Sequence, residues 1–126
     1  MKKVKILTLL SVGLLFLDRL TKWLAFNESG SLNFVKNFNF YFFSVNQCLL
    51  ATIIGAVIIL LLLLFIKTEN TALLLIIFGG ISNLFDRMYF GYVIDWINIS
   101  ISTFNIADIM IVLGIVCLIF RFKKFK

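Results

Sequence analysis

Four long apolar runs, joined by short polar segments, limit the fold of this chain more than any other feature. The runs extend over about residues 4–26, 49–66, 71–85 and 106–120, and proline is absent. Only helices and closed barrels satisfy their backbone groups in hydrocarbon, and unbroken apolar runs suit helices. A mean hydropathy of +1.09 is also too high for a soluble domain of 126 residues. We predict an all-α integral membrane protein, a four-transmembrane-helix bundle that forms one domain over residues 1–126.

The positions of the basic residues predict the orientation of this bundle. The net charge is +6, and seven of the twelve basic residues lie near the two ends: Lys2, Lys3, Lys5, Arg121, Lys123, Lys124 and Lys126. Lysine and arginine are enriched in the cytoplasmic segments of membrane proteins. We therefore expect both termini in the cytoplasm, residues 27–48 and 86–105 on the extracytoplasmic side, and no nucleic-acid partner.

The first run also has the form of a secretory signal peptide, with lysines before an apolar stretch. No small-residue cleavage site follows it, and Asp18, Arg19 and Lys22 occupy the region where cleavage would fall. A transmembrane span is the better interpretation.

The two extracytoplasmic segments alternate between apolar and polar residues, at about residues 33–45 and 92–102. Such alternation is typical of half-buried strands, so we expect a small interfacial β element. In the second segment Asp95 shares the apolar face with Val93, Ile97, Ile99 and Ile101, which is an unusual place for a carboxylate. Aromatic residues expected to set the depth of this region at the membrane interface are Trp23, Tyr41, Tyr89, Tyr92 and Trp96.

The absence of histidine excludes Ser-His and Cys-His nucleophile systems and the usual zinc ligands. The two cysteines, Cys48 and Cys117, lie in separate apolar segments without metal-binding spacing. We expect no metal and no cofactor. Any chemistry must then use carboxylates, lysine, hydroxyls or amides.

Four of the six acidic residues lie within or beside the apolar runs: Asp18, Asp86, Asp95 and Asp108. A charged side chain in a membrane span costs about 2.5–3.5 kcal/mol on insertion scales, so such residues are usually buried, paired and functional. Asp18 and Lys22 are four residues apart and predict an ion pair, whereas Arg19 is expected to point elsewhere, toward lipid headgroups. Asn105 is a candidate helix N-cap with Asp108 at the third helical position.

On the third run, a shared helical face carries Gly79, Gly80, Asn83, Asp86 and Arg87. One interpretation is a packing face of small residues that ends in an interfacial ion pair. The other is a polar site, which Asn83 favours because an amide one turn inside the span needs a partner.

Four blocks of residues, in order along the chain, resemble the motifs of lipoprotein signal peptidase, the type II enzyme. The blocks are Asp18-x-x-x-Lys22, Gly80-x-x-Asn83-Leu-Phe-Asp86-Arg87, Gly91-x-Val93-x-Asp95 and Phe104-Asn105-x-Ala107-Asp108. The resemblance covers essentially the whole chain. It implies an aspartic endopeptidase of the bacterial inner membrane that works among membrane lipids, and we expect it to be a monomer. Its substrate would be a diacylglyceryl-modified prolipoprotein, cut just before the lipidated cysteine.

The resemblance also implies roles for individual residues. Asp95 and Asp108 match the catalytic aspartates of the family. Residues that match substrate-binding or site-ordering positions are Asn83, Arg87, Asn105, Asp86, Asn46, Asp18 and Lys22. The chain departs from the family at the start of the second run, where Asn46-Gln47-Cys48-Leu49-Leu50 replaces Asn-x-Gly-x-x-Phe/Ser. Only Asn46 carries over there.

Two aspartates close together in a low-dielectric site cannot both ionise cheaply, so the pair is expected to share a proton. One carboxylate can then activate a water while the other acts as an acid. Segments Phe38–Phe43 and Val93–Ile101 are expected to form an interfacial cradle over the pair.

Three alternatives remain open. The first is a serine peptidase with Ser82 as nucleophile and Lys22 as base. The second is a small proton- or cation-coupled membrane subunit that uses the buried aspartates, although the second run is apolar throughout. The third is a catalytically altered homologue that binds lipoprotein precursors without cutting them.

Overall fold

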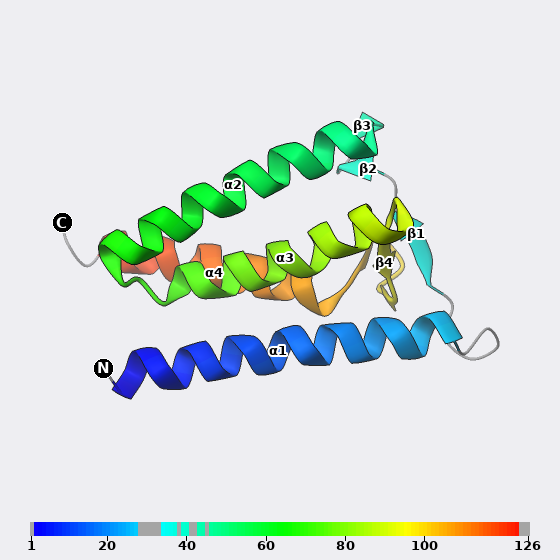
Figure 1. Ribbon diagram of the computed structural model, residues 1–126. Coiled ribbons are helices and arrows are strands. Elements are labelled where there is room, and N and C mark those ends of the chain that lie inside the picture. Colours follow the sequence, from blue (N-terminus) through cyan, green and yellow to red (C-terminus); the bar gives the residue numbers. More distant parts are fainter. Residues whose placement is uncertain (1, 28–33, 38, 41–42, 45, 124–126) are drawn as a thin grey trace.

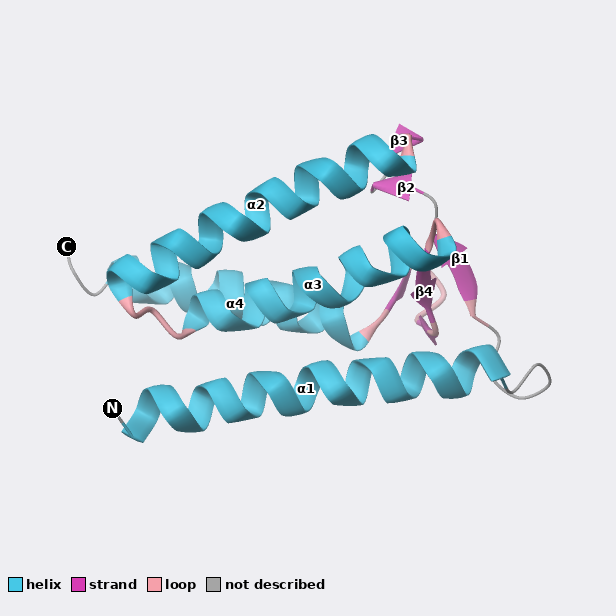
Figure 2. Cartoon of the chain, viewed as in Figure 1, coloured by secondary structure: helices cyan, strands magenta, loops and turns pink. Residues whose placement is uncertain are grey.

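The chain folds into four helices that run side by side, with short strands gathered at one end (Figure 1). The computed structural model describes residues 2–27, 34–37, 39–40, 43–44 and 46–123. The helices are α1 (Lys2–Asn27), α2 (Gln47–Thr68), α3 (Ala72–Phe90) and α4 (Ile106–Lys123). The start of α1 and the turn between α2 and α3 lie at the end opposite to the strands (Figure 2). By length and composition, α2 and α3 are long and apolar enough to cross a membrane.

The strands form three antiparallel pairs. β1 (Val35–Asn37) pairs with β4 (Val93–Asp95), β2 (Asn39–Phe40) with β3 (Phe43–Ser44), and β5 (Ile97–Asn98) with β6 (Thr103–Phe104). The alternation over residues 92–102 predicts one extended strand, but the structure breaks it at Trp96 and turns the chain near Ser100, which has a φ of 55°. Ile101 is consequently 95% exposed instead of sharing a face with buried Asp95.

Helix α3 continues beyond the end of the third apolar run, which the sequence places at Phe85. It ends at Phe90 because Gly91 adopts a φ of 77° and its N–H bonds the carbonyl of Arg87. Asp86 and Arg87 are 0% and 8% exposed, so they face the bundle and do not mark the water boundary. The drop in hydropathy at these residues therefore marks a buried polar site on α3 and not the end of the helix.

The glycines of α3 and α4 bring the two backbones close together. A Cβ added at Gly79 would lie 2.6 Å from the carbonyl oxygen of Ala107, and one added at Gly114 would lie 2.9 Å from the carbonyl oxygen of Ala72. Small residues at such crossings let helices pack by direct backbone approach. The apolar core beside this contact contains Ile58, Leu73 and Ile77.

We predict that Gly79→Ala destabilises the protein by about 1–3 kcal/mol, because the obstructing atom is a backbone oxygen that cannot rotate away. Gly55→Ala is the matched control, since its added Cβ would have no neighbour nearer than 3.9 Å. Thermal unfolding of the purified proteins in detergent measures both effects. Equal unfolding midpoints for the two variants would contradict the prediction.

Candidate active site

Separate elements bring four aspartates to the end of the bundle that carries the strands. Asp18 lies on α1, Asp86 on α3, Asp95 at the end of β4, and Asp108 in the first turn of α4. The first three are no more than 1% exposed, and Asp108 is half-buried. Within the described residues, no three His, Cys, Asp or Glu side chains are grouped closely enough to hold a metal ion.

Asn105 fixes the two predicted catalytic aspartates relative to each other. Its side-chain Nδ2 donates to Asp95 Oδ1 at 2.7 Å, and its backbone N–H donates to Asp108 Oδ2 at 3.1 Å. Its Oδ1 accepts from the backbone N–H of Asp108 at 3.0 Å, which is the N-cap that the spacing predicts. One fully buried residue therefore holds both carboxylates, Asp95 through its side chain and Asp108 through its backbone N–H.

Two more asparagines hold the remaining oxygens of this pair. Asn37 Nδ2 donates to Asp95 Oδ2 at 2.9 Å, and Asn83 Nδ2 donates to Asp108 Oδ1 at 2.8 Å. Each of the four carboxylate oxygens thus accepts an N–H from an asparagine. Asn37 is absent from the residues that the sequence motifs single out, because it belongs to none of the four blocks.

The pKa of Asp95 is raised from its ordinary value of 3.8 to about 6, and burial of the carboxyl is the largest cause. The negative charge of Asp108 raises this pKa further, while hydrogen bonds from Asn37 and Asn105 and the positive charge of Lys22 lower it. A carboxyl with such a pKa gains and loses its proton near neutral pH, which is the range that general acid–base catalysis needs.

Lys22, whose partner Asn83 bonds Asp108, joins α1 to α3. Its Nζ lies 2.9 Å from Asp18 Oδ2, 2.8 Å from Asp86 Oδ2 and 3.0 Å from Asn83 Oδ1, and the side chain is fully buried. The predicted Asp18–Lys22 ion pair is confirmed, and Asp86 joins it as a second anion. Asp18 Oδ1 also accepts the backbone N–H of Ala107 at 2.9 Å, which ties α1 to the start of α4.

The expectation that Arg19 points toward lipid headgroups is wrong. Its Nη2 donates to Asp86 Oδ1 at 2.6 Å, and its Nη1 donates to the carbonyl and the hydroxyl of Ser82 at 3.1 and 3.2 Å. The guanidinium also lies 5.0 Å from the ring centre of Phe85. A signal for this was present in the sequence, because Arg19 lies three residues before Lys22 and shares its helical face.

The same contacts argue against a serine nucleophile activated by lysine. Ser82 Oγ donates to Asp18 Oδ2 at 2.5 Å. The Nζ of Lys22 contacts Asp18, Asp86 and Asn83. In the part of the chain that the structure describes, no hydrogen bond joins it to the hydroxyl of Ser82, which is bonded to Asp18 instead.

At the start of α2, Asn46 and Gln47 take different partners. Asn46 Oδ1 accepts from the backbone N–H groups of Cys48 and Leu49 at 2.9 and 3.3 Å, so Asn46 caps the helix. Within the described residues, no hydrogen bond joins it to the aspartates. Gln47 Oε1 instead accepts from Arg87 Nη1 at 2.8 Å, so Gln47, at an unspecified position of the family motif, connects α2 to the site.

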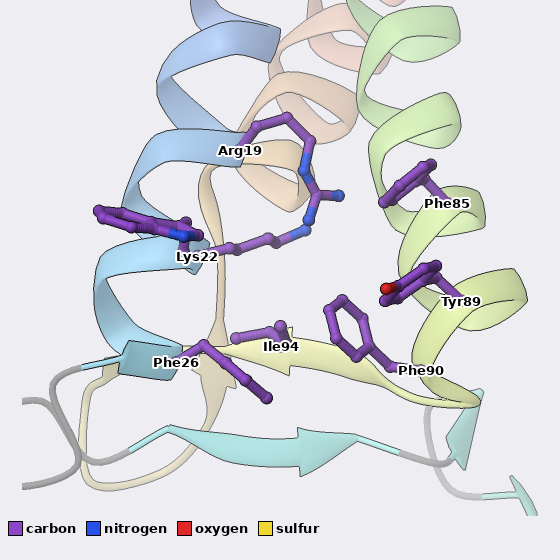
Figure 3. A pocket seen from close by; sticks show the side chains of 8 residues that line it. Arg19, Lys22, Phe26, Phe85, Tyr89, Phe90 and Ile94 are labelled. Atoms are coloured by element: carbon purple, nitrogen blue, oxygen red, sulfur yellow. The ribbon is translucent and has the colours of Figure 1, made fainter.

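A cavity of about 230 Å³ lies between α1 and α3 (Figure 3). It is lined by two basic residues, Arg19 and Lys22, and otherwise by Trp23, Phe26, Phe85, Tyr89, Phe90 and Ile94. Adjacent residues of a strand point to opposite faces, so Asp95 points away from the cavity that Ile94 lines. This cavity is therefore separate from the aspartate pair.

The buried ion pair on α1 generates a stability prediction. Lys22→Met leaves two carboxylates in a buried position without their shared cation, so we expect a loss of about 3–5 kcal/mol in unfolding free energy. Lys67→Met, at an exposed position near the end of α2, is the control. Chemical unfolding in detergent, followed by tryptophan fluorescence, measures the difference, and equal stability of the two variants would show that the cation does not hold the bundle.

The pKa of Asp95 generates a second prediction. Because it lies above 3.8, the folded protein binds this proton more tightly than the unfolded chain, and the contribution of Asp95 to stability is lost as the pH rises through about 6. We expect a protonated carboxyl band in infrared difference spectra that titrates with a midpoint of about 6 and is absent from Asp95→Asn. A midpoint near 3.8 would contradict the burial of this group.

Comparison with known proteins points to one family. The family model described as signal peptidase (SPase) II matches residues 10–124. A lipoprotein signal peptidase of Chlamydia pneumoniae is 31% identical over 102 residues, which cover 77% of this chain and 60% of that protein. A lipoprotein signal peptidase of Buchnera aphidicola subsp. Baizongia pistaciae is 36% identical over 110 residues, covering 73% and 68%. The chain therefore spans less than two thirds of the chlamydial relative.

Solved structures share the fold. A bacterial membrane enzyme determined at 2.3 Å resolution superposes with a TM-score of 0.84 at 21% identity, covering 98% of this chain and 89% of the other. A second bacterial membrane enzyme, determined at 1.9 Å, gives a TM-score of 0.79 at 20% identity and covers 97% and 93%. The arrangement of helices and strands is thus one that known membrane enzymes adopt.

Proposed function

This chain belongs to the signal peptidase II family, and we propose that it is an aspartic endopeptidase that cleaves signal peptides from diacylglyceryl-modified bacterial prolipoproteins. The cut falls just before the lipidated cysteine. The observation that carries this proposal is the buried pair Asp95 and Asp108, held together by Asn105. Both residues belong to the blocks that resemble the family's motifs.

The catalytic cycle uses one proton shared by the two carboxylates. The ionised carboxylate takes a proton from a water molecule, whose oxygen attacks the scissile carbonyl carbon. The protonated carboxyl donates to the carbonyl oxygen, and collapse of the tetrahedral intermediate breaks the C–N bond as a proton passes to the leaving nitrogen. A pKa of about 6 for Asp95 suits it to hold the shared proton at mildly acidic pH.

The other motif residues order this pair. Asn83 bonds Asp108, and Lys22 bonds Asn83 while it also neutralises Asp18 and Asp86. Arg87 and Asn46 lie at the side of the site nearest to α2, where Arg87 contacts Gln47. We assign six of these residues, Asn83, Lys22, Asp18, Asp86, Arg87 and Asn46, together with Asn105, to substrate binding or site ordering.

All four helices cross the membrane in this proposal. α1 and α4 carry more charge than α2 and α3, but the charges at the strand end of α1 are paired inside the bundle, which lowers the cost of a span. The terminal lysines and Arg121 support cytoplasmic ends in the inner membrane, with the aspartate pair toward the extracytoplasmic face. The enzyme acts as a monomer.

The strands form an interfacial cradle beside the aspartate pair. Ile99 and Ile101 are 55% and 95% exposed on the β5–β6 hairpin, where they can contact acyl chains or the substrate helix. Phe38, Tyr41 and Phe42 of the expected cradle lie outside the described residues.

Transport is a weaker proposal. The buried ionisable groups gather at one end of the bundle, and α2 is apolar along its length. A proton or cation path would need polar groups across the whole membrane.

We expect Asp95→Asn and Asp108→Asn to lower cleavage of a diacylglyceryl-modified precursor peptide by at least about 10²-fold, because each removes one half of the acid–base pair. The assay follows signal-peptide release by purified protein in detergent. Glu69→Gln, in the exposed turn after α2, is expected to keep full activity.

Circular dichroism and thermal unfolding establish that each variant is folded, and the same peptide without its lipid tests the substrate class. Wild-type rates from a folded Asp95→Asn protein would falsify the assignment.

A further inference from the structure

We infer that Asn37, on the strand between α1 and α2, is a positioning residue for Asp95. The inference rests on the proposed function for its consequence in catalysis. Asn37 belongs to none of the four motif blocks. The segment between α1 and α2 that contains it contributes only Asn46 to the residues that the sequence singles out.

The register of the sheet explains how Asn37 reaches the aspartate. In the β1–β4 pair, Val35 lies opposite Asp95, and Asn37 lies opposite Val93. Residues two apart on a strand share a face, so the side chains of Asn37 and Asp95 are diagonal neighbours on one face of the sheet. The distance of 2.9 Å from Asn37 Nδ2 to Asp95 Oδ2 follows from this register.

The contact determines the plane of the Asp95 carboxylate. The χ2 torsion of aspartate has broad, nearly two-fold preferences, so a single hydrogen bond does not fix the rotation of the carboxylate about this bond. Asn105 holds Oδ1 from the start of α4, and Asn37 holds Oδ2 from β1. With two donors on two elements, the carboxylate keeps a fixed orientation toward a water or a substrate carbonyl.

The contact also affects the proton on Asp95. The charged groups around Asp95 are Asp108 on α4, Lys22 on α1 and Arg87 on α3. A change at residue 37 leaves these charges in place. Because the amide of Asn37 stabilises the ionised carboxylate, its removal raises the pKa of Asp95 above about 6.

The test uses two variants that remove the amide, Asn37→Leu and Asn37→Ser, in the full-length protein. Asn70→Leu is the matched control, because Asn70 lies in the turn between α2 and α3, at the end of the bundle opposite the strands, where its side chain bonds the backbone N–H of Ala72. One measurement is kcat/KM for the diacylglyceryl-modified peptide as a function of pH. The other is infrared titration of the Asp95 carboxyl without substrate, assigned by comparison with Asp95→Asn.

We expect both Asn37 variants to lower kcat/KM by about 10- to 100-fold, the effect of losing one hydrogen bond to a charged group. The infrared midpoint and the alkaline limb of the pH profile should both move to higher pH. The control should match the wild type in both measurements.

An infrared midpoint that stays at about 6 in a folded Asn37 variant would overturn the inference, even if its activity falls, because a purely structural role would lower activity without moving the proton. Unchanged activity together with an unchanged midpoint would overturn it as well. The titration needs no substrate, so it decides the role of Asn37 even if the peptide is not cleaved and the proposed function fails.

Discussion

The rest of the site depends on the buried ammonium of Lys22. Three oxygen atoms, from Asp18, Asp86 and Asn83, lie within 3.0 Å of its Nζ, and they come from two helices. Without the cation, the two carboxylates would repel each other in a low-dielectric region, and α1 would lose the contacts of its ammonium with Asp86 and Asn83. The position of Asn83 follows from the same contact, and Asn83 in turn holds Asp108.

Local spacing predicts some of these contacts well. Asp18 and Lys22 are four residues apart on one helix, and Asn105 and Asp108 are three apart at a helix start, so standard helical geometry places each pair in reach. The order of the motif blocks predicts the family, and the family model agrees. The apolar runs predict the four helices, although not the extension of α3 to Phe90.

Residue spacing alone does not predict contacts between segments that are distant in the sequence. Arg19 and Asp86 are 67 residues apart, and Asn37 and Asp95 are 58 apart. Their meeting depends on how α1 packs against α3 and on the register of β1 against β4, which single-sequence periodicity does not determine. The division of residues 92–102 into two strands and a turn has the same origin, because tertiary pairing outweighs a regular alternation of side chains.

Ala107, the neighbour of Asp108, is clamped on both sides of its peptide backbone. Its N–H bonds Asp18, and its carbonyl oxygen fills the space that a side chain at residue 79 would occupy. Asp108 is therefore anchored to the helices, whereas Asp95 ends a three-residue strand that pairs with β1. The two carboxylates thus rest on supports of different kinds, a packed helix start for Asp108 and a two-stranded sheet for Asp95, and Asn105 is the residue that joins the two supports.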